Sequence, residues 1–253
     1  MNATARKVLV IPARRHSTRL PEKLLLRETG KTILQYTYEA ACRARQPDLV
    51  IIAVDDEKLA EEARRFGASV VMTSPDHTSG TDRVAEVVNR LPSAEIIVNL
   101  QADEPEINPA DIDKLFDVLE ANTKAGVATL ATPIRSREAL EDPACVKVVF
   151  DSRGQALYFS RSPIPHPREW DERLLAAEPP QFHQHVGIYG YRRWPLLRLA
   201  ETPPCRLEQI EKLEQLRILQ QGDEILVATV DSAAQGIDTP ADYAAFVERC
   251  RAA

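Results

Sequence analysis

The sequence predicts an α/β fold in three layers, with a mainly parallel sheet and an antiparallel extension. Its first half alternates short apolar runs with stretches of helical periodicity. Hydrophobic residues make up 44% of the chain, which is enough for a full core. Repeated strand–helix units favour parallel strands joined by right-handed crossovers, with helices on both faces of the sheet.

In the first half we expect five strands and four helices in alternation. The strands are expected at 7–13, 49–54, 69–72, 95–100 and 127–132, and the helices at 32–45, 56–66, 80–91 and 109–122. Thr32 is the expected N-cap of the first helix, because a threonine side chain can accept from the first free amides. Gly67 stands where the second helix should end.

The second half has a different pattern. The runs at 146–150 and 155–160 flank a short loop that ends in glycine, which is a hairpin signal. The proline-rich stretch 162–182 is expected to run over the surface. Further strands are expected at 185–191 and 225–230, and helices at 206–221 and 239–250. We predict one domain over 1–253, with an antiparallel excursion over roughly 150–192 that covers a substrate or pairs with another subunit.

Composition narrows the class of protein. The 253 residues carry a net charge of −6 with a pI near 5.5, which argues against a nucleic-acid binder. The four cysteines are far apart and form no CxxC pair, which fits reduced thiols in a cytosol. The chain runs directly into a strand without a signal peptide, and no apolar run approaches the ~20 residues of a membrane span. We expect a cytoplasmic protein.

A basic loop follows the first strand. The strand should break at Pro12 into a loop with Arg14, Arg15, Arg19 and Lys23. Ligands bind at this edge of an open α/β sheet, and crowded cations favour an anion between them. We therefore expect a triphosphate site, although a solvated basic turn is the ordinary alternative. The loop lacks the glycines of a Walker loop or a dinucleotide fingerprint.

An acidic turn follows the fourth strand. Asp103 and Glu104 lie in it, at the same sheet edge as the basic loop. Magnesium takes carboxylate, phosphate and water oxygens, so Asp103 is a candidate ligand. Asp238 is the best second candidate because it also follows a strand. The ordinary alternatives are a turn-capping carboxylate for Asp103 and a helix N-cap for Asp238.

A polar loop at 72–81 enters a helix at Gly80. Its amides and short hydroxyls suit recognition of a base or a sugar. Its alternative is a long loop before a capped helix. In the second half, His185 and Tyr189 lie four apart on a strand and so point to one face. Arg161 could bind a carboxylate bidentately, or it could form an ordinary surface pair.

The expected helix at 206–221 carries several charged and amide side chains. Helical spacing puts Glu211 and Gln215 on one face, and it puts Glu214 near Arg217. Most glutamates on helices are solvated, so this pattern by itself assigns no role.

Taken together, these segments resemble the 3-deoxy-manno-octulosonate cytidylyltransferases, which make CMP-Kdo from CTP and 3-deoxy-D-manno-octulosonate (Kdo). They occur in order and cover nearly the whole chain. The matching segments are 10–14, 17–21 with Lys23, 72–73, 76–83, 98–101, 103–105, 144–149, 156–161, 185–191, 207–217 and 236–240.

The resemblance implies the nucleotide-diphospho-sugar transferase fold, a homodimer paired through the extension, Mg²⁺ as cofactor, and cytidylyl transfer for lipopolysaccharide biosynthesis. It implies site residues of four kinds. The catalytic ones are Lys23, Asp103, Arg14 and Arg19. Those that bind CTP are Pro12, Ala13, Arg14, Ser17, Arg19, Lys23, Met72, Thr73, Ser79, Gly80, Arg83 and Gln101. The sugar acid is surrounded by Arg161, His185, Tyr189, Glu214 and Gln215, and the metal is held by Asp103 and Asp238.

The chain departs from the family pattern in the two turns that carry these residues. Glu22 stands where a glycine is usual, and it adds a negative charge near the phosphates. Leu24 replaces a proline. Ala102 also replaces a glycine, which would cost about 1 kcal/mol or more if that position needed a positive φ.

Two other functions stay open at this point. One is a cytidylyltransferase for a related sugar acid, such as sialate or an 8-amino analogue of Kdo. The other is a non-catalytic module that binds a nucleotide and regulates another process, with Glu22 and Ala102 as marks of a decayed site.

Overall fold

The computed structural model describes residues 4–252 and divides the chain into two compact units. Unit 1 comprises residues 1–116 and 234–253, and unit 2 comprises residues 117–233, so the boundary falls within α4 (Pro109–Ala121). The expectation of a single domain stays a prediction, and each unit is described by itself.

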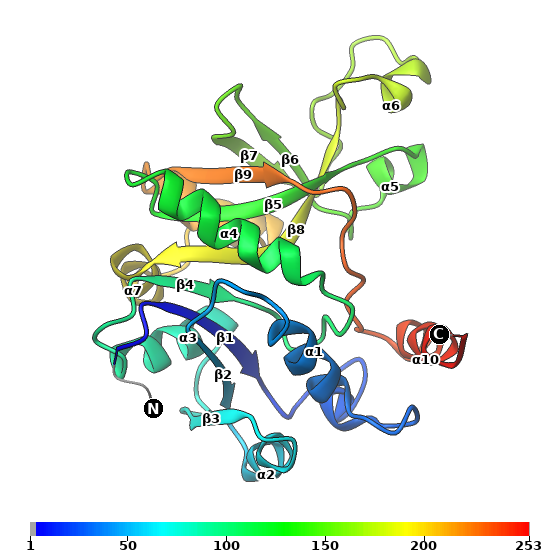
Figure 1. The fold of residues 1–253 in the computed structure, drawn as a ribbon. Coiled ribbons are helices and arrows are strands. Elements are labelled where there is room, and N and C mark those ends of the chain that lie inside the picture. The colour runs from blue at the N-terminus through cyan, green and yellow to red at the C-terminus, as the bar shows by residue number, and fades with distance from the viewer. Residues whose placement is uncertain (1–3, 253) are drawn as a thin grey trace. The chain divides into compact units, whose positions relative to one another are not determined.

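Unit 1 contains a parallel sheet in the order β3-β2-β1-β4 (Figure 1). Its strands are β1 (Lys7–Ala13), β2 (Leu49–Val54), β3 (Ser69–Met72) and β4 (Ile96–Asn99). The first three have the bounds expected for them. β1 does not break at Pro12, because Pro12 and Ala13 continue the pairing with β2. The basic loop therefore starts one residue after the strand's last pair, at Arg14.

Helices cover this sheet on both faces, as the complete burial of β1 from Val8 to Ala13 requires. They are α1 (Ile33–Ala41), α2 (Glu57–Arg65) and α3 (Gly80–Asn89), whereas η1 (Lys23–Leu25) and α10 (Pro240–Ala252) pack against α1. The cap expected at Thr32 is present, since its side chain accepts from the amide of Gln35 over 3.2 Å. Gly67 follows α2 with φ 81°, a conformation that glycine adopts readily.

Unit 2 has a mixed set of strands. They are β5 (Val127–Pro133), β6 (Lys147–Phe150), β7 (Ala156–Ser160), β8 (His183–Arg192) and β9 (Ile225–Thr229). β5 pairs antiparallel with β8 and parallel with β9, and the predicted hairpin of β6 and β7 is confirmed. The α/β class with a mainly parallel sheet and an antiparallel extension is thereby confirmed.

Unit 2 has two short helices where one helix was predicted at 206–221. The helices of this unit are α5 (Arg137–Glu141), α6 (Arg173–Ala176), α7 (Arg193–Glu201), α8 (Arg206–Glu211) and α9 (Gln215–Gln220). The helix expected at 206–221 is wrong, because Lys212 adopts a left-handed conformation at φ 55° and ends α8. Glu211 and Gln215 therefore belong to different helices and share no helical face.

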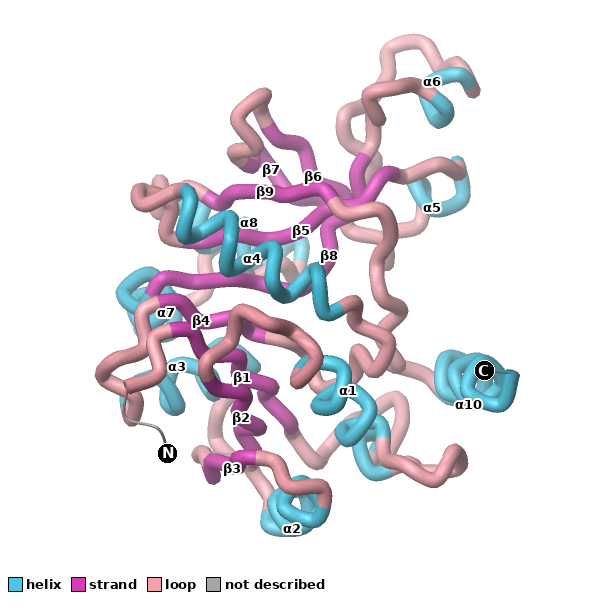
Figure 2. The backbone as a smooth tube through the Cα atoms, viewed as in Figure 1, coloured by secondary structure: helices cyan, strands magenta, loops and turns pink. Residues whose placement is uncertain are grey.

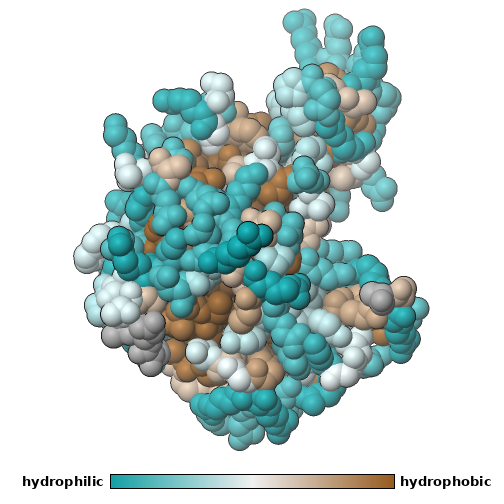
Figure 3. All heavy atoms as spheres, in the orientation of Figure 1, coloured by the Kyte–Doolittle hydropathy of each residue, from teal (hydrophilic) through white to brown (hydrophobic). Residues whose placement is uncertain are grey.

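The proline-rich stretch contains little regular structure, as expected. Figure 2 shows α5 and α6 as short helices among loops. A small cluster of Ile134, Leu140, Leu175 and Phe182 holds this region together by apolar burial. In Figure 3 the surface around α6 is covered mostly by hydrophilic residues. Within residues 4–252, no helix is both long and apolar enough to cross a membrane.

Candidate active site

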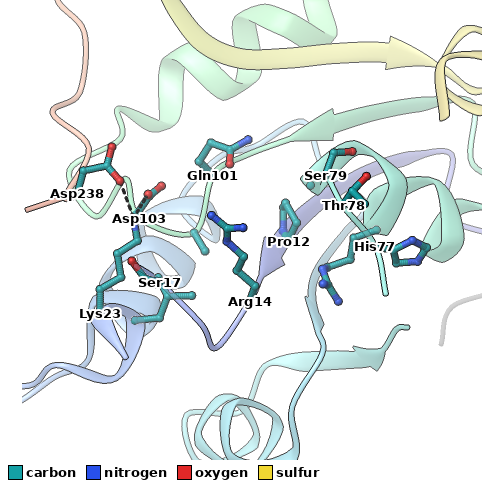
Figure 4. Close-up of a pocket in the computed structure, with 14 residues that line it drawn as sticks. Pro12, Arg14, Ser17, Lys23, His77, Thr78, Ser79, Gln101, Asp103 and Asp238 are labelled. Atoms are coloured by element: carbon teal, nitrogen blue, oxygen red, sulfur yellow. Dashed lines mark hydrogen bonds and ion pairs between the residues drawn. The ribbon is translucent and has the colours of Figure 1, made fainter. Parts of the chain in front are cut away.

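A cavity of about 250 Å³ opens in unit 1 where β1 and β4 end and α3 begins. This is the sheet edge at which the sequence predicted a ligand. Figure 4 shows Lys23, Asp103 and Asp238 at one end, His77, Thr78 and Ser79 at the other, and Arg14 and Gln101 between them. The lining residues are Pro12, Arg14, Ser17, Lys23, Leu24, His77, Thr78, Ser79, Gly80, Arg83, Gln101, Ala102, Asp103 and Asp238.

Most of the residues predicted for CTP and metal line this cavity, but four do not. Ala13 is buried in β1, and Arg19 reaches the site only through its ion pair with Asp238. Met72 is exposed at the end of β3. Thr73 is buried, and its hydroxyl donates to the carbonyl of Val54 over 2.9 Å. The cavity is therefore not lined by Ala13, Met72 or Thr73.

Arg14 is the most available cation of the cavity. Among residues 4–252 it has no hydrogen-bond or ion-pair partner. The nearby Arg83 is buried and pairs with Asp55 over 3.1 Å. Burial lowers the pKa of Arg83, and the positive charge of Arg14 adds to that effect. Two neighbouring guanidinium charges make this wall attractive for an anion.

Lys23 lies between two carboxylates. Its Nζ donates to Asp103 Oδ2, to Asp238 Oδ1 over 2.9 Å and to the carbonyl of Ile237 over 3.0 Å. Burial opposes the charged ammonium, yet Asp103 and Asp238 outweigh it and raise the pKa of Lys23. Arg19 pairs with the other oxygen of Asp238 over 2.8 Å. Positively and negatively charged side chains therefore alternate at this end of the cavity.

Asp238 is not a helix cap, so the alternative weighed for it is wrong. Thr239 caps α10 instead: its hydroxyl accepts from the amide of Asp242 over 3.2 Å, and the Asp242 carboxylate accepts from the amide of Thr239 over 2.8 Å. β9 ends at Thr229, so Asp238 belongs to the loop before α10 and does not directly follow a strand. This reciprocal cap leaves the Asp238 carboxylate for Lys23 and Arg19.

The polar loop is both a helix cap and a wall of the cavity. The Ser79 side chain accepts from the amide of Asp82 over 3.1 Å, and the Asp82 carboxylate accepts from the amide of Ser79 over 3.1 Å. This capping box fixes the first turn of α3 beside the cavity. His77 and Thr78 also line the cavity, and the sequence reasoning did not select them. Their place inside the matched segment 76–83 was the available signal.

The acidic turn offers a donor set that fits magnesium bound together with phosphate. Asp103 and Asp238 already share one cation, the Lys23 ammonium. Beside them, Glu104 Oε2 is buried without a hydrogen-bond partner, and burial followed by the Asp103 charge raises the pKa of Glu104 to about 8. Residues 4–252 contain no group of three or more metal-ligating side chains. Magnesium usually takes only one or two protein carboxylates, with phosphate and water as the remaining ligands.

Two of the three departures in the turns, Ala102 and Glu22, differ in their consequences. In the described part of the chain, Glu22 and Lys212 are the non-glycine residues with positive φ. Ala102 is therefore free of the strain that the sequence reasoning considered, and its carbonyl accepts from the Thr37 hydroxyl over 2.9 Å. Glu22 does adopt the conformation that glycine favours, at φ 51°. Its carboxylate pairs with Arg15 over 2.8 Å and with Lys58 over 2.9 Å.

The predicted sugar residues all lie in unit 2, and the structure brings several of them together. The rings of His185 and Tyr189 lie 5.3 Å apart, which confirms that both point to one side of β8. His185 Nε2 lies 2.9 Å from the Thr129 hydroxyl, and burial lowers the pKa of His185 to about 3. Burial raises the pKa of Tyr189, and the charge of Glu214 adds to that shift. Gln215 is buried at the start of α9.

Arg161 is held by protein groups. Its Nε donates to the carbonyl of Glu211 over 2.6 Å, and its Nη1 donates to the carbonyl of Pro143 over 2.9 Å. Its amide donates to the Glu211 carboxylate over 2.9 Å. The residue is therefore neither an ordinary surface ion pair nor a free fork for a carboxylate. Glu211, which the sequence reasoning linked to Gln215, instead fixes the end of β7.

The sequence of this chain is similar to those of known cytidylyltransferases. A family model described as cytidylyltransferase matches residues 8–225. A 3-deoxy-manno-octulosonate cytidylyltransferase of Rhodopirellula baltica is 50% identical over 243 residues, covering 96% of this chain and 97% of the relative. One of Escherichia coli is 43% identical over 237 residues, covering 94% and 93%.

A solved structure has the same fold along almost its whole length. It is CMP:2-keto-3-deoxy-manno-octonic acid synthetase complexed with CTP, which is 41% identical and gives a TM-score of 0.90 over 98% of this chain and 99% of that chain. Both the resemblance and the fold class read from the sequence are thus confirmed. The chain belongs to the 3-deoxy-manno-octulosonate cytidylyltransferase family.

Proposed function

We propose that the protein transfers the cytidylyl group of CTP to Kdo. The anomeric hydroxyl oxygen of Kdo attacks the α-phosphorus, and the hydroxyl proton passes to solvent water. The bond between the α-phosphorus and the α,β-bridging oxygen breaks, so that CMP-Kdo and pyrophosphate form. The observation that carries the proposal is the Lys23 ammonium held between Asp103 and Asp238 in a cavity that also contains Arg14, which has no partner among the residues that the structure describes. The relatives named for this reaction at 43–50% identity support the choice of substrates.

The triphosphate would lie against the basic loop. Arg14 is available for phosphate oxygens, and its planar fork suits them. Lys23 and Arg19 supply two more cations, each now balanced by an aspartate. These fixed cations would stabilise the charge that develops on the phosphate oxygens, and such stabilisation usually contributes most of the rate enhancement in phosphoryl-transfer chemistry. Removing one such cation typically lowers turnover by about 10²-fold or more.

The nucleoside would lie against the opposite wall. Ser79, Gly80 and the first turn of α3 present amides and hydroxyls there, and Gln101 presents an amide group. These neutral donors and acceptors can read a base or a ribose without adding charge. Pro12 and Ser17 complete the wall between the two ends. Arg83, held by Asp55, would support this region with a fixed positive charge.

Asp103 and Asp238 would hold magnesium. When bound, the ion would withdraw charge from the phosphate oxygens that it contacts. The protein contributes the placement of the two carboxylates: the amide of Ile237 donates to the Asp103 carbonyl over 2.9 Å, which joins the two acidic loops. Lys23 and Arg19 together balance the charge of both carboxylates when phosphate is absent.

The sugar acid would be surrounded by Arg161, His185, Tyr189, Glu214 and Gln215. With a pKa of about 3, His185 is neutral near pH 7, so it can offer a hydrogen bond and no charge. Its contact with the Thr129 hydroxyl and with the Tyr189 ring orients the imidazole.

We further propose a homodimer that pairs through the excursion at 150–192, and a place in the cytoplasm, where CMP-Kdo would supply lipopolysaccharide synthesis. Leu157 on β7 is exposed and lies within this excursion, so it is a suitable position at which to test the pairing. Sedimentation analysis would test the dimer, because Leu157→Asp should shift it toward the monomer.

The test of function is pyrophosphate release from the purified protein with CTP, magnesium and Kdo, omitting each in turn. Release that needs all three is the expected result. Release with sialate or 8-amino-Kdo and none with Kdo would keep the chemistry and change the sugar. CTP binding without release for any sugar acid would favour a regulatory nucleotide-binding module.

A further inference from the structure

We propose that Arg15, Glu22 and Lys58 form a charged clamp that holds the basic loop in place for the triphosphate. In this arrangement Arg15 is a positioning residue and does not bind phosphate, although it adjoins Arg14. The inference rests on the proposed function, and it assigns different tasks to the cations of one loop. In this subsection we call residues 14–23, which form the basic loop described above, the phosphate loop.

Glu22 is the strained position of the phosphate loop. It has φ 51° and ψ 29°, directly before η1 begins at Lys23. A side chain with a β-carbon disfavours this conformation, and glycine tolerates it. Something in the surroundings must therefore compensate, since Glu22 sets the backbone direction into Lys23, whose ammonium lies between Asp103 and Asp238.

The compensation is visible at the Glu22 carboxylate. Glu22 Oε1 accepts from Arg15 Nε over 3.0 Å and from Arg15 Nη2 over 2.8 Å. Lys58 Nζ donates to both carboxylate oxygens, over 3.0 and 2.9 Å. Lys58 first, and then Arg15, lower the pKa of Glu22. The negative charge that the sequence placed near the phosphates is thus neutralised by two cations.

Arg15 is fully engaged by acidic partners. Besides Glu22, its Nη1 donates to Asp56 Oδ2 over 3.0 Å, and its amide donates to Asp55 Oδ1 over 3.0 Å. Arg15 does not line the cavity, whereas Arg14 lines it. Two adjacent arginines therefore face different surroundings: the side chain of Arg14 is available to an anion, and that of Arg15 is held by carboxylates.

The clamp closes the phosphate loop on itself and fixes it to α2. Arg15 and Glu22 lie near its two ends, and Asp56 and Lys58 belong to the start of α2. Between the clamped ends lies Ser17, which lines the cavity, and Lys23 follows directly. Asp55 extends the network to Arg83 on the cavity wall over 3.1 Å. Loss of the clamp should therefore change how well the loop is arranged before CTP binds.

The clamp is partly exposed to solvent, which gives it a measurable signature. The side chains of Arg15, Glu22 and Lys58 are 34%, 42% and 52% exposed. Salt screens such pairs, and each single pair is weak. We therefore expect Glu22→Gln to raise KM for CTP about five-fold at low salt with kcat within about two-fold, and to differ less from the wild type at high salt.

Two further variants separate positioning from phosphate contact. Glu22→Gly loses the clamp but relieves the backbone strain, so its KM should stay within about two-fold of the wild type. Arg15→Ala should raise KM about five-fold in the wild type and by less than about two-fold in the Glu22→Gly background. An equal loss in both backgrounds, or a loss of kcat as large as for Arg14→Ala, would show that Arg15 binds phosphate and would overturn the proposal.

Amide hydrogen exchange of residues 15–23 supplies a readout besides activity. Exchange should become faster in Glu22→Gln and stay unchanged in Glu39→Gln, a matched control whose 38% exposed carboxylate pairs with Lys31 over 2.6 Å. Unchanged exchange in Glu22→Gln would contradict the clamp, even if Kdo proves to be the wrong sugar. A wild type without cytidylyl transfer but with the expected exchange pattern would remove the proposed function and leave the clamp standing.

Discussion

The Nζ atom of Lys23 lies 2.9 Å from Oδ1 of Asp238, so a cation from the basic loop already lies beside a carboxylate that is expected to bind a metal ion. Asp103 shares the same ammonium. Together with Arg19, which pairs with the other oxygen of Asp238, this ammonium balances the charge of both carboxylates before any phosphate arrives. This pairing also explains how two aspartates can lie so close without strong mutual repulsion.

Replacing Lys23 should separate its two roles. Lys23→Met should lower turnover by about 10²-fold or more, because a cation for the phosphates is lost. It should also strengthen binding of Mn²⁺ in the absence of CTP, since Asp103 and Asp238 lose their internal cation. Electron paramagnetic resonance titration with Mn²⁺ measures the second effect. Lys31→Met is the matched control, and weaker Mn²⁺ binding in Lys23→Met would contradict this explanation.

Asp238 and Thr239 are neighbours with different tasks, so their substitutions should have opposite profiles. Asp238→Asn should lower turnover by about 10²-fold with little change in the free energy of unfolding. Thr239→Ala removes the cap of α10 and should lower that free energy by about 1 kcal/mol, with turnover nearly unchanged. Denaturant unfolding and steady-state kinetics on both variants measure the two effects. The reverse pattern would mean that Asp238 has a structural role.

The parts of the fold that sequence predicts well are those with strong local signals. The bounds of β1, β2 and β3 follow from short apolar runs that end at polar loops, and the Thr32 cap follows from a side chain that satisfies a free amide. The cluster of Arg14, Lys23 and Asp103 was predictable because parallel strands end at one edge of the sheet. The features that the sequence did not predict depend on contacts between residues that are far apart in the chain.

Two examples show the limit. The turn at Lys212 has no glycine or proline to mark it, and Glu211 is drawn away to Ser160 and Arg161 across unit 2. No sequence pattern shows that partner. Likewise, sequence placed Asp238 after a strand, whereas the reciprocal cap between Thr239 and Asp242 and the distant Lys23 determine its direction.

The left-handed turn at Lys212 leads to a stability prediction. Lys212→Gly should raise the free energy of unfolding by up to about 1 kcal/mol, because glycine adopts φ 55° without the β-carbon penalty. Lys212→Ala keeps that penalty and serves as the control. Chemical denaturation measures both. Equal stability of the two variants would mean that the turn is not strained.

Acid sensitivity is expected from His185. Its pKa is about 3 in the folded protein and 6.5 when unperturbed, so between these values the unfolded chain binds the additional proton. The free energy of unfolding should therefore fall as pH drops from about 6.5 toward 3, by up to about 1.4 kcal/mol per pH unit from this residue. His185→Gln should have a flatter profile over that range. A variant with the slope of the wild type would contradict the assignment.

Lys147 should influence the sugar side of the reaction without touching substrate. It is completely buried in β6, and its Nζ donates to the carbonyls of Asp142, Cys145 and Arg161 over 2.9, 2.6 and 2.6 Å. Burial lowers the pKa of Lys147, so these three carbonyls are what keep its ammonium stable. Because one of them belongs to Arg161, the ammonium fixes the backbone of a predicted sugar residue.

Lys147→Met keeps the length of the side chain but leaves three inward-facing carbonyls without their donor. The free energy of unfolding should fall by about 3 kcal/mol, and KM for Kdo should rise while KM for CTP stays within about two-fold. Val148→Ala, a buried substitution in the same strand, should lower stability without that selective change in KM. Equal increases in both KM values for Lys147→Met would mean that Lys147 supports the fold in general and not the position of Arg161.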